Sequence, residues 1–97
     1  MSKAIVIPAF NTQASLERVL SEIPEASHSQ VIIVDDGSEV PLTADGFRII
    51  RHEQNRGYGA AQKTGYDAAL AMGVDRILLL HGDGQYATAD VLGLTDA

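Results

Sequence analysis

The chain has 97 residues and a mass of 10.3 kDa, the size of one domain or of a piece of one. Its composition, 45% hydrophobic and 21% charged, provides enough apolar material for a core and excludes a chain that is disordered throughout. The absence of cysteine excludes disulfides and thiolate metal sites, and a net charge of -6 with scattered basic residues argues against a nucleic-acid partner.

The sequence gives no sign of a membrane-spanning or secretory segment. No apolar run approaches the roughly 20 residues needed to cross a bilayer, and the first residues lead directly into a short strand-like run. We therefore expect a soluble, cytoplasmic chain. Peripheral attachment at the inner membrane face is left open for a longer protein that contains it.

The first elements predicted along the chain are a buried strand and an amphipathic helix. Residues 4–8 form an apolar run closed by a proline, which is typical of a strand buried on both faces of a parallel sheet. A helix follows, because the next apolar residues have the i, i+3, i+4, i+7 spacing of one helix face: Leu16, Val19, Leu20 and Ile23. Pro24 sets its end.

Two further strands and a second helix follow. Residues 31–34 are all β-branched and end in a polar turn, and residues 47–50 carry a single apolar patch typical of a short strand near a sheet edge. The alanine-rich residues 60–72, closed by Gly73, have the composition of a helix with a glycine at its C-terminal end. Gly65 within this helix costs about 1 kcal/mol relative to alanine, which predicts close packing against a neighbour.

Residues 77–80 form a fourth apolar run, and a short helix is predicted from Thr88 to Leu94. Strands that alternate with helices predict the α/β class, with right-handed βαβ units and an open parallel sheet that carries helices on its faces. Such sheets bind ligands in the crevice beyond the carboxyl ends of the strands, where the strand order reverses.

Polar clusters follow three of the predicted strands, at residues 8–12, 35–38 and 81–86. A parallel sheet brings all three to one rim. In the last cluster, the oxygens of Asp83 and Gln85 can converge and His81 can add an imidazole nitrogen, a donor set that suits Mg²⁺ or Mn²⁺. The alternative is that the glycines around Asp83 make no more than a tight turn.

The adjacent carboxylates of Asp35 and Asp36 repel each other and are costly to desolvate. A cation, a ring N–H donor, a ribose hydroxyl or water would compensate them, and their position at the expected rim favours a functional role. Residues 55–59 stand at a helix start, where backbone N–H groups and Arg56 attract anions such as phosphate. His28 and His52 are isolated in the sequence, and we expect solvent-exposed structural roles for both.

Taken together, four segments in this order resemble the family 2 glycosyltransferases. They are residues 6–11 (VIPAFN), 34–38 (VDDGS), 55–61 (NRGYGAA) and 81–86 (HGDGQY). Within the family, the chain is most similar to the polyprenyl- or dolichyl-phosphate mannosyl- and glucosyltransferases. The resemblance implies a GT-A fold, which is a Rossmann-like open parallel sheet with helices on both faces, and binding of a UDP- or GDP-type nucleotide-diphosphate sugar and a divalent cation.

The resemblance also implies roles for individual residues. The nucleotide sugar would be bound by Pro8, Phe10, Thr12, Val34, Asp36, Gly57 and Asp83. Thr12 stands where the family usually has glutamate, so a carboxylate contact to the nucleotide is lost or moved. The family's Asp-x-Asp-x-Gln metal segment falls on His81, Asp83 and Gln85, with His81 in place of the first aspartate.

The implied reaction is a metal-assisted, inverting transfer of the sugar to an acceptor such as a polyprenyl phosphate, so contact with a membrane would be indirect, through the acceptor. Residues 1–97 correspond to the nucleotide-sugar-binding half of such a domain, and the acceptor base is expected beyond residue 97. We expect this half to be poorly active alone and to form a homo-oligomer through the strand at 77–80, because an unpaired apolar edge strand associates.

Two alternatives from other classes remain. One is a catalytically silent domain that keeps the fold and acts in binding or oligomerisation. The other is a receiver-like phosphoacceptor module, which also places an acidic pair at strand ends, although here the pair follows the second strand and no later strand-end lysine can be placed.

Overall fold

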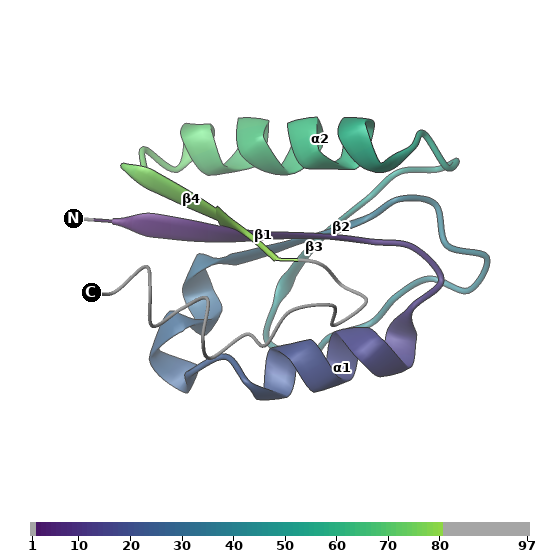
Figure 1. The fold of residues 1–97 in the computed structure, drawn as a ribbon, viewed down its shortest axis with the longest axis horizontal. Helices are drawn as coiled ribbons and strands as arrows, with labels where there is room; N and C mark the ends of the chain where they lie inside the picture. Colours follow the sequence, from purple (N-terminus) through teal and green to yellow (C-terminus); the bar gives the residue numbers. More distant parts are fainter. Residues whose placement is uncertain (1, 81–97) are drawn as a thin grey trace.

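The computed structural model describes residues 2–80 (Figure 1). In chain order, the elements are β1 (Lys3–Ala9), α1 (Gln13–Ser21), the 3-10 helix η1 (Glu25–Gln30), β2 (Val31–Asp35), β3 (Arg48–Arg51), α2 (Tyr58–Ala71) and β4 (Arg76–Leu79). Every strand and helix predicted within this range is present, and η1 is an addition that the apolar pattern does not predict. The helix predicted at 88–94 lies outside the described residues.

The strands form one parallel sheet in the order β3-β2-β1-β4. Ile7 is opposite Ile33, and Val6 is opposite both Ile32 and Leu79. The chain therefore progresses outward from β1 to β3 on one side and returns to the other side of β1 as β4, so the strand order reverses between β1 and β4. The predicted α/β fold with an open parallel sheet is confirmed.

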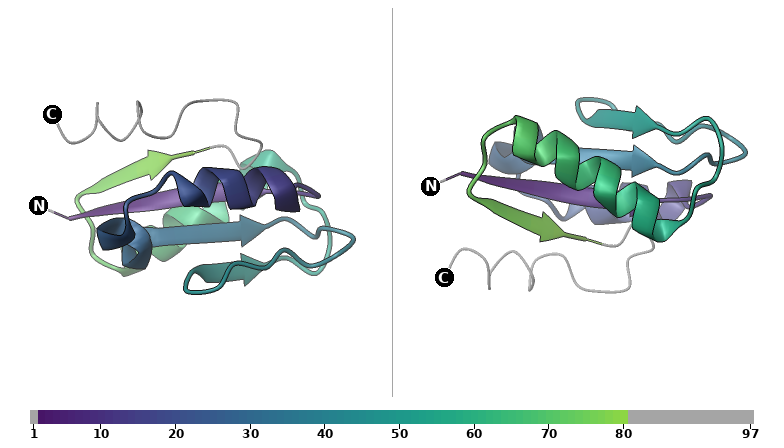
Figure 2. Two further views of the ribbon diagram at one scale, coloured as in Figure 1. Left: turned by 90° about the horizontal axis from the view of Figure 1, so that it is seen from below. Right: turned by 90° about the horizontal axis from the view of Figure 1, so that it is seen from above.

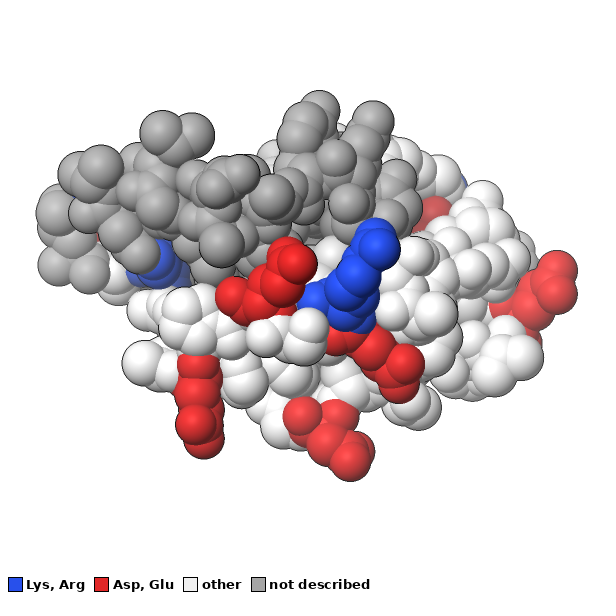
Figure 3. Space-filling view, turned by 60° about the horizontal axis from the view of Figure 1, so that its bottom comes forward, with Lys and Arg blue, Asp and Glu red and all other residues white. Residues whose placement is uncertain are grey.

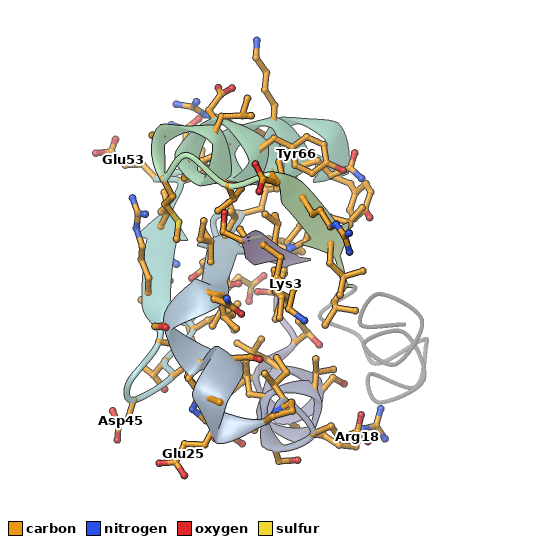
Figure 4. The ribbon with its side chains drawn as sticks, turned by 90° about the vertical axis from the view of Figure 1, so that its left-hand side faces the viewer. Lys3, Arg18, Glu25, Asp45, Glu53 and Tyr66 are labelled. Carbon is orange, nitrogen blue, oxygen red and sulfur yellow. The ribbon has the colours of Figure 1, made fainter. Side chains whose placement is uncertain are left out.

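Helices cover both faces of the sheet (Figures 1 and 2). Alternate side chains of β1 point to opposite faces, so Ile5 and Ile7 pack with α1 while Ala4 and Val6 pack with α2. All four apolar residues of the predicted first helix are buried in the α1 layer. Figure 4 shows these layers from the end at which Lys3 begins β1, with Tyr66 of α2 on one side of the sheet and Arg18 of α1 on the other.

The second helix lies close to the sheet because its buried face is made of small residues. These are Ala61, Gly65 and Ala69, one helical turn apart. A Cβ atom placed on Gly65 would overlap the side chain of Val6, so the predicted close packing at this glycine is confirmed. Gly73 follows the helix with a φ of 74°, and its N–H donates to the Leu70 carbonyl, as expected for a glycine that ends a helix.

Within the described residues, β4 is an edge strand. Its start is held to the residue before β1, since the N–H groups of Asp75 and Arg76 both donate to the Ser2 carbonyl. Its apolar side chains Ile77, Leu78 and Leu79 are only half-buried. None of the helices found in the described part of the chain has the length and apolar character required to span a membrane.

Candidate functional site at the carboxyl rim

The ends of β1, β2 and β3 lie together at the right-hand side of Figure 1. The backbone ladder continues beyond the strands, because the Asp36 N–H donates to the Ala9 carbonyl and the His52 N–H donates to the Asp35 carbonyl, both over 2.9 Å. We call residues 10–12, 36–43 and 52–57 the carboxyl rim. The structure thus brings together the polar clusters at 8–12 and 35–38, as predicted from the parallel sheet.

The first carboxylate of the acidic pair, Asp35, is fully buried and is satisfied from within the chain. It accepts hydrogen bonds from the backbone N–H groups of Ser38 and Leu42, both at 2.9 Å, and from the Arg51 guanidinium at 2.6 Å. Burial opposes ionisation, but the hydrogen bonds from Ser38, Leu42 and Arg51 outweigh it and lower the pKa of Asp35. Asp35 therefore organises the loop between β2 and β3.

The second carboxylate, Asp36, is 3% exposed and accepts four hydrogen bonds. One oxygen is bound by the ring of His52 at 2.8 Å and the N–H of Arg56 at 2.9 Å. The other is bound by the amide of Asn55 at 3.0 Å and the N–H of Gly57 at 2.9 Å. Burial would raise the pKa of Asp36, but the bonds from Arg56, His52 and Gly57 outweigh it and lower that pKa.

The anion bound at the start of α2 is the carboxylate of Asp36 itself. The N–H groups of Arg56 and Gly57 face the Asp36 carboxylate, so the same two groups are not offered to a phosphate. Asp36 has about four acceptor positions, and all are occupied from within the chain. Direct contact of Asp36 or Gly57 with a nucleotide stays a prediction.

The predicted exposure of His52 is wrong. The residue is 6% exposed, and its ring joins Asp36 on one side to the hydroxyl of Thr64 on the other, at 2.8 Å each. The prediction failed because His52 has no partner nearby in the sequence, and Asp36 and His52 come together only when β2 and β3 pair. The available signal was that the acidic pair needs compensation, for which a ring N–H donor was one of the four candidates.

His28, by contrast, has the structural role expected, although it is half-buried where exposure was predicted. Its ring nitrogen lies 3.0 Å from the Ile23 carbonyl, and its ring centroid lies 4.5 Å from that of Phe47. It belongs to η1, at the end of the sheet opposite the carboxyl rim.

A pair of amide side chains, missed by the sequence analysis, fastens the loop after β1 to the loop after β2. The side-chain amide oxygen of Asn11 accepts from the Glu39 N–H at 2.9 Å, and the backbone N–H of Asn11 donates to the Ser38 hydroxyl at 2.8 Å. Gln13 both donates to and accepts from the backbone of Thr43, each at 2.9 Å. A groove of about 460 Å³ lies beside this double contact.

The remaining predicted nucleotide-binding residues differ in accessibility. Pro8 and Val34 are buried neighbours in adjacent strands. Thr12 is the N-cap of α1, and its carbonyl accepts the first helical hydrogen bond from Leu16. Phe10 is 44% exposed, so its aromatic ring is accessible to a ligand. Their contacts with a nucleotide stay predictions.

The predicted metal ligands His81, Asp83 and Gln85 lie outside the described residues. Among residues 2–80, no group of three or more histidine and acidic side chains is placed to hold a metal ion. Figure 3 shows acidic side chains scattered over the α1 side of the molecule, in keeping with the net charge of -6. The metal site therefore stays a prediction from the motif.

An open parallel sheet with polar loops at a reversal of strand order has the architecture of nucleotide-binding α/β domains. The family model described as Glycosyl transferase family 2 matches residues 4–97. The chain therefore belongs to glycosyltransferase family 2, and the resemblance noted from the four motifs is confirmed.

Curated relatives agree with this membership. The chain is 28% identical, over 90% of its length, to a UDP-N-acetylglucosamine--dolichyl-phosphate N-acetylglucosaminyltransferase of Methanococcus voltae. It is 29% identical, over 97% of its length, to an undecaprenyl-phosphate 4-deoxy-4-formamido-L-arabinose transferase of Aeromonas hydrophila. It spans 43% and 32% of these two relatives.

The crystal structure of S. aureus TarS matches 99% of this chain with a TM-score of 0.55, at 16% identity and over 20% of the TarS chain. This likeness confirms the predicted GT-A type of fold. The receiver-like alternative has no support, since the chain belongs to a transferase family and both carboxylates of the acidic pair are occupied by internal hydrogen bonds.

Proposed function

We propose that this chain is the donor-binding part of a glycosyltransferase that moves a sugar, with inversion, from a UDP- or GDP-sugar to a polyprenyl phosphate. The observation that carries the proposal is the carboxyl rim, where the loops after β1 and β2 are fastened together beside the reversal of strand order between β1 and β4. Ligands of open α/β sheets bind at this place. The acceptor class follows from the two relatives, a dolichyl-phosphate and an undecaprenyl-phosphate transferase.

The residues of the carboxyl rim have distinct roles in this proposal. The exposed ring of Phe10 offers a flat surface for the nucleotide base. Asp36 supports the site through the turn at 55–57, which its carboxylate holds in place by hydrogen bonds. The exposed Arg56 contributes positive charge for the diphosphate.

His81, Asp83 and Gln85 are the proposed metal ligands. Their imidazole, carboxylate and amide donors fit Mg²⁺ or Mn²⁺, and a cation bound there would offset the charge of the departing nucleotide diphosphate. We assign no acceptor base to residues 1–97.

Isothermal titration calorimetry with UDP-N-acetylglucosamine, UDP-glucose and GDP-mannose tests the proposal, each with Mg²⁺, with Mn²⁺ and with EDTA. We expect binding of at least one nucleotide sugar that is weakened by EDTA. Asp83→Ala should remove the metal-dependent part of the affinity, whereas Asp67→Ala, an exposed aspartate on α2, should leave it unchanged. No binding of any of the three sugars under any condition contradicts the proposal and favours a catalytically silent domain.

A further inference from the structure

His52 is a buried histidine that the proposed function does not use directly. It follows β3, one of the two edge strands, yet it is only 6% exposed. One ring nitrogen contacts Asp36 after β2, and the other contacts Thr64 of α2, both at 2.8 Å. A single side chain thus connects a strand end of the sheet to the helix above it.

The contact with Asp36 bears on the turn at 55–57. Three of the four hydrogen bonds that fill the Asp36 carboxylate come from that turn, and the fourth comes from His52. An ionised carboxylate can only accept, so the ring nitrogen facing Asp36 carries a hydrogen. His52 therefore holds the carboxylate from one side while the turn wraps it from the other.

The surroundings leave little freedom for this arrangement to shift. Gly37 adopts a φ of 74°, and a Cβ atom there would overlap the backbone of Gln54 and Asn55. The segment that carries Asp36 is thus packed directly against the backbone of the turn. A change in the position of the carboxylate must be transmitted to residues 55–57.

We propose that His52 is a positioning residue of the donor site: through Asp36 and Thr64 it fixes the turn at 55–57, and with it the position of Arg56, whose positive charge is offered to the nucleotide diphosphate. This inference rests on the proposed function. His52 is buried and acts through Asp36, so it is not a catalytic residue.

Three variants test the role. His52→Leu removes both ring hydrogen bonds, His52→Asn retains an N–H donor close to the position of the ring nitrogen that faces Asp36, and Thr64→Val removes only the hydroxyl. With UDP and GDP as probes in Mg²⁺, we expect His52→Leu to weaken binding about tenfold or more, the scale of a lost hydrogen bond to a charged group. His52→Asn should recover most of this loss, and Thr64→Val should show a smaller loss.

The matched control is His28→Leu. His28 also contacts a neighbour through its ring, but at the end of the sheet opposite the carboxyl rim. We expect this variant to lower the melting temperature and leave nucleotide affinity unchanged, whereas a merely structural His52 would behave in the same way as His28. Affinity of His52→Leu equal to that of the wild type, or of folded His52→Asn no better than His52→Leu, overturns the proposal.

Amide hydrogen exchange separates this inference from the proposed function. The N–H groups of Arg56 and Gly57 donate to a buried carboxylate, so they should exchange slowly, and about tenfold faster in His52→Leu than in His28→Leu. Unchanged exchange in a chain that binds nucleotide refutes the role of His52 alone. A wild-type chain that binds neither nucleotide refutes the donor site, and the positioning role falls with it.

Discussion

The two adjacent carboxylates at the end of β2 make folding stability depend on pH in a definite direction. The pKa values of Asp35 and Asp36 are both lowered in the folded chain, whereas an unfolded aspartate has a pKa of about 3.9. Their contribution to the free energy of unfolding is therefore fully present above that value and is lost as pH falls through the folded pKa values. Urea unfolding between pH 7 and pH 3 should show the loss below about pH 4.

Asp36→Asn tests the same point by substitution. The new amide nitrogen would face N–H donors instead of accepting from them, so we expect a loss of about 1–3 kcal/mol at pH 7 and a shallower decline on acidification. Asp45→Asn, on an exposed loop, is the control and should reproduce the wild-type pH profile. A profile of Asp36→Asn that parallels the wild type contradicts this assignment.

The close approach of α2 to the sheet can be tested with two glycines of that helix. Gly65→Ala places a methyl group against Val6 and Val34, an overpacking that costs about 1–3 kcal/mol, against a gain of about 1 kcal/mol in helix propensity. We expect a net loss in the free energy of unfolding. Gly59→Ala has nothing within 4 Å of the added carbon and should gain up to about 1 kcal/mol. Equal effects of the two substitutions in chemical denaturation would show that packing does not limit position 65.

The elements themselves were predictable because their signals are local. The buried strands, the apolar face of α1 and the glycine that ends α2 each depend on residues within one or two turns or on an uninterrupted run. The contacts of the carboxyl rim are not local. Asp36 and His52 are 16 positions apart and Asn11 and Glu39 are 28 apart, so their meeting depends on which strands pair. The predicted meeting of the clusters at 8–12 and 35–38 is confirmed, but the motifs could not show that the two carboxylates accept hydrogen bonds from the chain itself.

At the scale of the whole molecule, the sheet has two kinds of edge. On one side, β3 begins and ends with exposed arginines, and charged side chains of this kind discourage pairing with another strand. On the other side, β4 carries half-buried Ile77, Leu78 and Leu79, and no strand within residues 2–80 covers its outer edge. Self-association is therefore expected at β4 and not at β3.

A proline substitution on the outer edge of β4 tests this expectation. The Arg76 N–H donates to the Ser2 carbonyl just before β1, and the Leu80 N–H donates to the Val6 carbonyl of β1, so the alternation along a strand directs the N–H of Ile77 outward. Ile77→Pro removes that donor and keeps the bonds to β1, as edge strands tolerate. Sedimentation velocity over a concentration series should show a wild type that associates and a variant shifted toward monomer.

The control is Leu70→Lys, on the exposed face of α2, which should associate as the wild type does. A wild type that stays monomeric at high concentration, or an Ile77→Pro variant that associates equally, contradicts pairing through β4.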